Sequence, residues 1–220
     1  MKNIKAIIFD AYGTLFDVNS AAEKCKDKIG DKWEAFANYW RTTQLEYTWL
    51  RSLMKRHKDF WQVTEDSLDK SMKVFNIDNS MRNELLDLYK ILSPYPEVPE
   101  VLKSLKEKKY KLSILSNGTP SLLNELVKSN NLENLFDDIF SIEEVGIYKP
   151  DSKVYDLPIK KYKIKNNEVA FLSANTWDVS GGGNYGFNSI WVNRNNSIFD
   201  NLDYRPQYEV KSLKELINII

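Results

Sequence analysis

The sequence has almost no residues that cross-link a chain or bind soft metal ions, with one cysteine, Cys25, and one histidine, His57, among 220 residues. One cysteine forms no disulfide within the chain, and this pair is too small a ligand set for structural zinc. Hydrolysis by Ser-His-Asp or Cys-His is also disfavoured, since no serine stands in a sharp strand-to-helix turn before His57 and Cys25 lies in a lysine-rich helical stretch. We expect Cys25 to be a plain helical residue and His57 an ordinary surface residue.

An excess of charge of either sign is absent as well, because 31 Lys and Arg residues balance 31 Asp and Glu residues. This removes the electrostatic argument for binding nucleic acid or an anionic membrane surface. The longest early apolar run, Ala6–Phe9, is also much too short for a signal peptide or a membrane span. We therefore expect a cytoplasmic protein with no nucleic-acid partner and no membrane partner.

The composition is that of a folded protein, with 42% hydrophobic and 13% aromatic residues. Five short apolar runs have the character of strands buried on both faces, and three segments between them carry apolar residues at helical spacing. The runs are 5–10, 112–115, 138–141, 169–172 and 189–192, and the helical segments are 98–109, 121–129 and 153–161. This alternation predicts an α/β fold with a doubly wound, Rossmann-like parallel sheet.

A long stretch without strand character interrupts this alternation after the first run. Within it we expect helices at 33–54, 64–75 and 79–91, and the proline-rich segment 93–99 ends the last of them. The first helix carries apolar residues on two sides, so one side should be covered by the core or by a second subunit. We therefore predict an α/β core domain of residues 1–17 and 93–220, an inserted helical cap domain of residues 18–92, and a homodimer.

Polar side chains follow the predicted strands where ligands bind in open α/β sheets. The first strand ends at Asp10, the second in Ser116–Pro120, and another in Ser173–Asp178, while Gly146–Pro150 places Lys149 in a nearby loop. Each feature alone is common in turns and helix caps. Together they predict one cleft containing two carboxylates, one lysine and several small polar donors.

These motifs resemble those of the haloacid dehalogenase superfamily over essentially the whole chain. The resemblance is carried by Phe9-Asp10-Ala-Tyr-Gly-Thr14, Ser116-Asn117-Gly, Tyr148-Lys149-Pro150 and Ser173-Ala-Asn175-Thr-Trp-Asp178. Within the insertion, the segment from Tyr39 to Leu53 is similar to the one that distinguishes the L-2-haloacid dehalogenase branch from phosphatases of the same fold. The resemblance implies a haloacid dehalogenase-type core and hydrolysis of short L-2-haloacids to D-2-hydroxy acids and halide, with inversion at carbon 2.

The departures from the phosphatase pattern concern metal binding. Superfamily phosphatases carry a second acid two residues after the nucleophile, where this sequence has Tyr12, and an acidic metal ligand where it has Ser173 or Asn175. A hard cation needs several oxygen ligands, so we expect no metal and no cofactor. Tyr12 and Trp177 also make the cleft more apolar, which favours an organic halide over a phosphate ester. A Mg²⁺-dependent phosphatase and a catalytically silent binding module remain the alternatives.

The chemistry then assigns a role to each charged residue. Asp10 is the candidate nucleophile, Lys149 the cation that keeps it ionised, and Asp178 the group that orients or deprotonates water. The resemblance implies that Arg41 and Asn117 receive the halide, and that Ser116 and nearby backbone N–H groups hold the substrate carboxylate. It further implies pocket walls and orienting groups, namely Leu45, Phe60, Thr14, Ser173, Asn175 and Tyr155.

One further motif, Gly181-Gly-Gly183-Asn-Tyr-Gly186, satisfies the dinucleotide-binding glycine pattern. It follows Ser173–Asp178 and does not open a helix directly after a strand. We therefore interpret it as a loop or helix end before the last strand.

Overall fold

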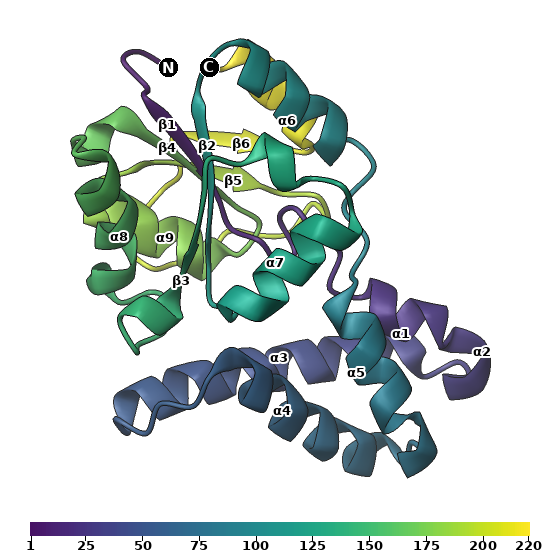
Figure 1. The fold of residues 1–220 in the computed structure, drawn as a ribbon. Helices are drawn as coiled ribbons and strands as arrows, with labels where there is room; N and C mark the ends of the chain where they lie inside the picture. The colour runs from purple at the N-terminus through teal and green to yellow at the C-terminus, as the bar shows by residue number, and fades with distance from the viewer.

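The sheet has six parallel strands in the order β3-β2-β1-β4-β5-β6 (Figure 1). The computed structural model describes all residues from 1 to 220. The strands are β1 (Ala6–Phe9), β2 (Lys111–Ser116), β3 (Asp138–Ser141), β4 (Val169–Ser173), β5 (Asn188–Val192) and β6 (Tyr208–Val210). The five apolar runs of the sequence form β1 to β5, and the predicted doubly wound α/β class is confirmed.

Two pairs of helices cover the two faces of this sheet (Figure 1). They are α6 (Val98–Glu107) and α7 (Pro120–Ser129) on one face, and α8 (Ser152–Tyr162) and α9 (Thr176–Tyr185) on the other. The strand order changes direction between β1 and β4, because the chain first builds outward to β3 and then returns past β1 to build outward to β6. In doubly wound sheets this switch point is where ligands bind.

Two short segments differ from the sequence-based expectation. The strand β6 was not predicted, since it has three residues of which Tyr208 and Glu209 are exposed. The glycine-rich segment lies mostly inside α9, and the helix ends at Tyr185 before Gly186, whose φ is +107°. A side chain at either of two glycines would clash with a tyrosine. A Cβ atom at Gly181 would lie 2.4 Å from the Tyr155 hydroxyl oxygen, and one at Gly183 would lie 1.9 Å from Cζ of Tyr204. The three consecutive glycines therefore serve close packing inside a helix.

The regular elements between β1 and α6 are all helices, and they form a separate layer beside the carboxyl ends of the strands (Figure 1). Its helices are α1 (Ser20–Lys24), α2 (Lys26–Ile29), α3 (Trp33–Leu53), α4 (Phe60–Phe75) and α5 (Arg82–Lys90). Cys25 lies between α1 and α2 and is buried. An inserted helical cap, as predicted, therefore faces the edge of the sheet where the polar motifs end. No helix in the protein combines the length and the apolar character needed to cross a membrane.

The long helix α3 buries Phe36 and Trp40 as its apolar pattern suggests, but its second half buries a different set of residues. In its second half the buried positions are Thr43, Gln44 and Thr48. Leu50 and Leu53, by contrast, are 50% and 80% exposed. The helix thus keeps an uncovered apolar end in the single chain, while the interior side of its second half is polar.

The helical layer is attached to the core at two places. At one end the chain crosses between the two parts twice, and the crossings pair through hydrogen bonds from Asp17 N to Ser93 O (2.8 Å) and from Tyr95 N to Leu15 O (3.0 Å). We call this pair of crossings the hinge.

At the other end of α3, the loop before α4 binds the segment that leads to Lys149. Glu143 accepts a hydrogen bond from Phe60 N (3.3 Å), and its second carboxylate oxygen lies 2.9 Å from His57 Nε2. Tyr148 donates from its hydroxyl to Lys58 O (2.5 Å) and from its backbone N to Ser52 Oγ (3.3 Å). These four contacts form what we call the clasp. His57 is therefore not an ordinary surface residue, because it is partly buried and pairs with Glu143.

Candidate active site

The register of the central strands brings the predicted polar residues together. Phe9 of β1 pairs with Ile114 of β2 on one side and with Leu172 of β4 on the other. The next residue, Asp10, donates from its backbone N to Leu172 O (2.9 Å). Asp10 is therefore level with the ends of β2 and β4, and its carboxylate lies at the switch point of the sheet.

One carboxylate oxygen of Asp10 is surrounded by hydrogen-bond donors. Its Oδ2 accepts from Asn175 Nδ2 (2.8 Å), Thr14 Oγ1 (3.1 Å) and Ser173 Oγ (3.3 Å). Asn175 occupies the N-cap position of α9, yet its side chain reaches to Asp10 and caps nothing. Thr14 is fixed in turn by Ala174 N, which donates to its hydroxyl at 2.8 Å. This oxygen is therefore held in place by three donors.

Lys149 lies between the two carboxylates. Its Nζ donates to Asp10 Oδ1 (3.3 Å), Asp178 Oδ2 (2.9 Å) and Leu115 O (2.7 Å). The side chains of Lys149, Asp10 and Asp178 are 1%, 7% and 0% exposed. Burying a charge costs several kcal/mol unless it is paired and hydrogen-bonded, and here one ammonium group serves both carboxylates. We call these three residues the charged triad.

Asp178 occupies the first turn of α9, and its Oδ1 accepts a hydrogen bond from the hydroxyl of Tyr155 on α8 (2.8 Å). Burial raises the pKa of Asp178 to about 6, and the negative charge of Asp10 acts in the same direction. Lys149 and the Tyr155 hydroxyl oppose this rise because both stabilise the ionised carboxylate. A carboxylate with a pKa near neutrality is well suited to accept a proton from water.

The end of β2 adds two polar side chains with free donors. Ser116 Oγ accepts from Gly118 N (3.1 Å), which leaves the serine hydroxyl hydrogen available. Asn117 Oδ1 accepts from the backbone N of Lys149 (3.1 Å), so its amide nitrogen points away from that bond. Both residues are buried.

Arg41 of α3 reaches toward this site from the helical layer. Its Nη1 donates to Gln44 Oε1 (2.8 Å) and its Nη2 to the backbone oxygen of Tyr12 (3.5 Å). No carboxylate forms an ion pair with Arg41, although thirteen other ion pairs are present in the protein. Its positive charge is therefore not neutralised by a neighbouring acid.

Aromatic rings of the helical layer pack around Tyr12, two residues after Asp10. Tyr12 packs against Phe60 at the start of α4 (ring centroids 5.2 Å apart) and against Tyr89 of α5 (5.7 Å). Burial raises the pKa of the Tyr12 phenol, whose hydroxyl has no hydrogen-bond partner. A Cβ atom at Gly118 would lie 3.0 Å from this hydroxyl, so the glycine allows the ring to approach the end of β2.

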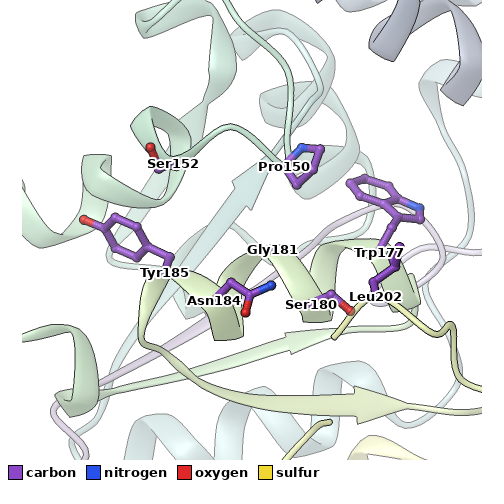
Figure 2. Close-up of a pocket in the computed structure, with 8 residues that line it drawn as sticks. All are labelled: Pro150, Ser152, Trp177, Ser180, Gly181, Asn184, Tyr185 and Leu202. Atoms are coloured by element: carbon purple, nitrogen blue, oxygen red, sulfur yellow. The ribbon is translucent and has the colours of Figure 1, made fainter. Parts of the chain in front are cut away.

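The two remaining predicted residues, Leu45 and Trp177, make no hydrogen bond to the charged triad. Leu45 is a half-buried residue of α3, and no contact in the structure ties it to the triad. Trp177 of α9 packs edge-on against Trp49 of α3, with ring centroids 5.4 Å apart. A cavity of about 450 Å³ on the outer side of α9 is lined by Trp177, Pro150 and Tyr185, but by none of the triad (Figure 2). We therefore place the candidate site on the other side of Trp177.

Two hollows flank Trp177 between the helical layer and the sheet. One, of about 340 Å³, is lined by Arg41, Tyr12 and Asn175 among others. The second, of about 450 Å³, is mostly apolar and is lined by Lys149, Trp49 and Leu53 among others. Small molecules can thus approach the charged triad along polar and apolar walls.

The donor set does not suit a magnesium ion. No group of three or more His, Cys, Asp or Glu side chains is close enough to hold a metal ion. The two acids of the site share the ammonium group of Lys149, and Asp10 Oδ2 already accepts three hydrogen bonds. We derive no catalytic step through a metal.

Sequence reasoning missed the groups that hold Arg41 and the clasp. Gln44, Thr64 and Tyr89 are buried together beneath Arg41, and Glu143 lies in the clasp. A glutamine or threonine in an amphipathic helix normally indicates a solvated face, so the pattern carries no signal for them. The one available hint was the polar stretch inside the otherwise aromatic segment 39–53.

Comparisons with known proteins agree with this geometry. A family model described as haloacid dehalogenase-like hydrolase matches residues 4–186. An (S)-2-haloacid dehalogenase of Pseudomonas sp. (strain YL) is 39% identical, over 100% of this chain and 95% of that protein. A solved dehalogenase is 36% identical with a TM-score of 0.98 over 100% of this chain and 98% of that one.

A solved L-2-haloacid dehalogenase from Xanthobacter autotrophicus, with chloropropionic acid covalently bound, is 32% identical with a TM-score of 0.91. It covers 98% of this chain, and the match spans 98% of that chain. The relatives and the family model thus match both the helical insertion and the sheet that carries the charged triad. The chain belongs to the haloacid dehalogenase-like hydrolases.

Proposed function

We propose that this protein hydrolyses short L-2-haloacids to D-2-hydroxy acids and halide through an ester on Asp10. The observation that carries the proposal is the charged triad, in which one buried lysine contacts the carboxylates of Asp10 and Asp178. The (S)-2-haloacid dehalogenase relatives and the dehalogenase holding covalent chloropropionic acid support it. A hydrolase acting on carbon–halide bonds needs a nucleophile, a base for water and a site for halide. Asp10, Asp178 and Arg41 supply these three functions.

In the first step Asp10 attacks carbon 2 of the substrate. Three donors occupy Oδ2, whereas Oδ1 accepts only from Lys149, so Oδ1 is the freer oxygen for attack. The new Oδ1–C2 bond forms on the side opposite the carbon–halogen bond, which breaks with both electrons going to the halide. This displacement inverts carbon 2 and leaves an ester on Asp10.

In the second step water attacks the carboxyl carbon of that ester. Asp178 accepts the proton, and its pKa of about 6 leaves it mostly ionised at neutral pH. The negative charge that develops on Oδ2 meets the donors of Thr14, Ser173 and Asn175, which act as an oxyanion hole. The Cγ–Oδ1 bond then breaks as Asp178 returns its proton to Oδ1, and the hydroxy acid leaves with Oδ1. Asp10 keeps the oxygen from water and loses the remaining proton to solvent, which restores both carboxylates.

Binding of the substrate falls to residues around the triad. The Ser116 hydroxyl and nearby backbone N–H groups are placed to hold the substrate carboxylate, while Arg41 and the Asn117 amide nitrogen receive the halide. Arg41 suits this role because no carboxylate neutralises it. Tyr12 and Phe60 form the apolar walls. Walls are also expected from Leu45 and Trp177, and Tyr155 orients Asp178.

We further propose that residues 18–92 act as a cap domain on a core of residues 1–17 and 93–220. The paired crossings of the hinge support this division. The exposed apolar side chains at the end of α3 support a homodimer. A cytoplasmic location and the absence of nucleic-acid and membrane partners stay predictions.

The covalent ester is tested by a single turnover of 2-chloropropionate in heavy-oxygen water, with enzyme in excess. The hydroxy acid should carry ordinary oxygen, because its new oxygen is Oδ1 of Asp10, and the label should be found in the peptide containing Asp10. Heavy oxygen in the first product would contradict the proposal, since water would then have attacked the substrate directly.

Two variants separate the two steps. Asp10→Asn should release no halide, whereas Asp178→Asn should release one equivalent and accumulate an ester visible by intact mass. Release of halide by Asp10→Asn at the unmodified rate would contradict the role of Asp10. Turnover should also survive dialysis against EDTA, and a loss restored by Mg²⁺ would favour the phosphatase alternative.

A further inference from the structure

Gln44 is a fully buried amide inside the helical layer, and it makes more hydrogen bonds than any other side chain near Arg41. It is 1% exposed and contacts residues of three helices. Its Oε1 accepts from Arg41 Nη1 (2.8 Å), and its Nε2 donates to Thr64 Oγ1 (2.7 Å) and Tyr89 OH (3.0 Å). Burying an amide is unfavourable compared with an apolar side chain of similar size unless its bonds are made. An apolar side chain at position 44 would be enough to pack the core of the helical layer, so the buried amide calls for another explanation.

The direction of each hydrogen bond in this network is fixed by chemistry. A guanidinium group has only donors, so the atom facing Arg41 must be the carbonyl oxygen of Gln44. The amide nitrogen then faces Thr64, whose hydroxyl hydrogen is used by Phe60 O (2.7 Å). The hydroxyl oxygen of Thr64 is thus free to accept. The bonds therefore run in one direction from Arg41 through Gln44 and Thr64 to the first residue of α4.

The network also determines where the guanidinium group lies. With Nη1 bound to Gln44, the other terminal nitrogen is directed to the backbone oxygen of Tyr12, two residues after Asp10. Tyr89, which the amide of Gln44 contacts, packs against the ring of Tyr12. One buried amide thus connects the cation of the helical layer to the loop of the nucleophile.

We propose that Gln44 is a positioning residue that holds Arg41 in place for the departing halide without neutralising its charge. The proposal rests on the halide-receiving role given to Arg41 above. A carboxylate at position 44 would hold the guanidinium group as firmly but would compete with the halide for its charge. A neutral amide holds the group and leaves its full charge available.

The test compares halide release from 2-chloropropionate and 2-bromopropionate by the wild type, Gln44→Met and Gln44→Glu. Chloride is the poorer leaving group and depends more on stabilisation by Arg41. We expect Gln44→Met to slow the chloro substrate about tenfold more than the bromo substrate, the loss typical of one charged hydrogen bond, with little change in KM. The same substitution at the exposed Gln62, whose side chain bonds only Asp66, should change neither rate.

Gln44→Glu keeps the inference testable if Gln44→Met folds poorly, because the Tyr89 hydroxyl can donate to a carboxylate and Thr64 can do so by giving up its bond to Phe60 O. It should raise the chloro-to-bromo discrimination as well, and added bromide should inhibit it about tenfold more weakly than it inhibits the wild type. Equal slowing of both substrates, or unchanged ratios and bromide inhibition in the Glu variant, would contradict the role of Gln44. A wild type that releases no halide would instead contradict the proposed function itself.

Discussion

The surroundings of Asp178 make its carboxylate a suitable proton acceptor. Its carboxylate is completely buried, which raises the pKa to about 6, while Lys149 and Tyr155 hold it in the ionised form. The ionised fraction falls as pH drops through this value. We therefore expect the rate of ester hydrolysis to fall on the acid side, because protonated Asp178 accepts no proton from water. Its midpoint should lie below pH 6, because the ester removes the negative charge of Asp10 that helps to raise the pKa of Asp178.

Replacing Tyr155 by Phe should move this midpoint to higher pH. The Tyr155 hydroxyl donates to Asp178 Oδ1 at 2.8 Å and stabilises the ionised form, so its loss raises the pKa of Asp178 further. A hydrogen bond to a charged group corresponds to a shift of about one pH unit. The measurement is the pH dependence of single-turnover ester hydrolysis. Tyr185→Phe is the matched control, because the Tyr185 hydroxyl bonds Asp156. A midpoint that stays in place, or moves to lower pH, would contradict the assignment.

For single residues, the sequence predicted the site residues that follow strands better than the site residues that lie inside helices. Asp10, Ser173 and Asp178 were placed in one cleft because parallel strands end at one edge of a sheet, and the structure brings them together. Gln44 and Glu143 were not predicted, since their partners are far away along the chain and follow no period. Their roles depend on tertiary contacts that a pattern of apolar spacing does not contain.

At the scale of elements, α9 carries three consecutive glycines in its interior, which is unfavourable for a helix taken alone. Replacing Gly181 by Ala adds a Cβ atom 2.4 Å from the Tyr155 hydroxyl and 2.7 Å from Pro150 Cβ. The gain in helix propensity is about 0.5–1 kcal/mol, whereas overpacking costs about 1–3 kcal/mol. We expect Gly181→Ala to lower the Tm by a few degrees and to slow ester hydrolysis, because Tyr155 must move away from Asp178.

Ser180→Ala is the control for this prediction. Ser180 precedes Gly181 in the same helix, is buried, and has a hydroxyl without a hydrogen-bond partner. Removing an unsatisfied buried hydroxyl should leave the Tm unchanged or raise it slightly. Thermal unfolding of both variants gives the comparison, and a higher Tm for Gly181→Ala would show that propensity, not packing, governs this helix.

The elements that the sequence predicted well are those whose burial is complete. All four residues of β1 are fully buried, and its apolar run was recognisable for that reason. The edge strand β6 has one buried residue and gave no run. In the second half of α3 the apolar residues near the end are exposed and polar residues are buried, so the pattern predicted the helix correctly but not the buried face of that half. Local spacing predicts which element forms, while its orientation depends on what packs against it.

For the whole molecule, the uncovered end of α3 leads to the predicted homodimer. Leu53 and Met54 are 80% and 61% exposed, and Leu50 is half exposed beside them. Light scattering at micromolar concentration should give about twice the chain mass. Leu53→Asp should lower it to one chain, because a buried unpaired carboxylate is strongly unfavourable, whereas Ile198→Asp, at a residue 92% exposed elsewhere, should not. A wild type that is a monomer would contradict the prediction.

The clasp and the hinge hold the helical layer at both ends, and this has a consequence for how fast the enzyme can work. The charged triad is at most 7% exposed, so we expect the two hollows beside Trp177 to open fully to it only when the clasp releases. Its four hydrogen bonds, at a net value of about 1 kcal/mol each, keep roughly one molecule in a thousand open. If the layer closes again within about ten microseconds, it opens about a hundred times per second. We therefore expect the contacts around Glu143 to limit turnover to about that frequency, however fast the chemistry at Asp10 is.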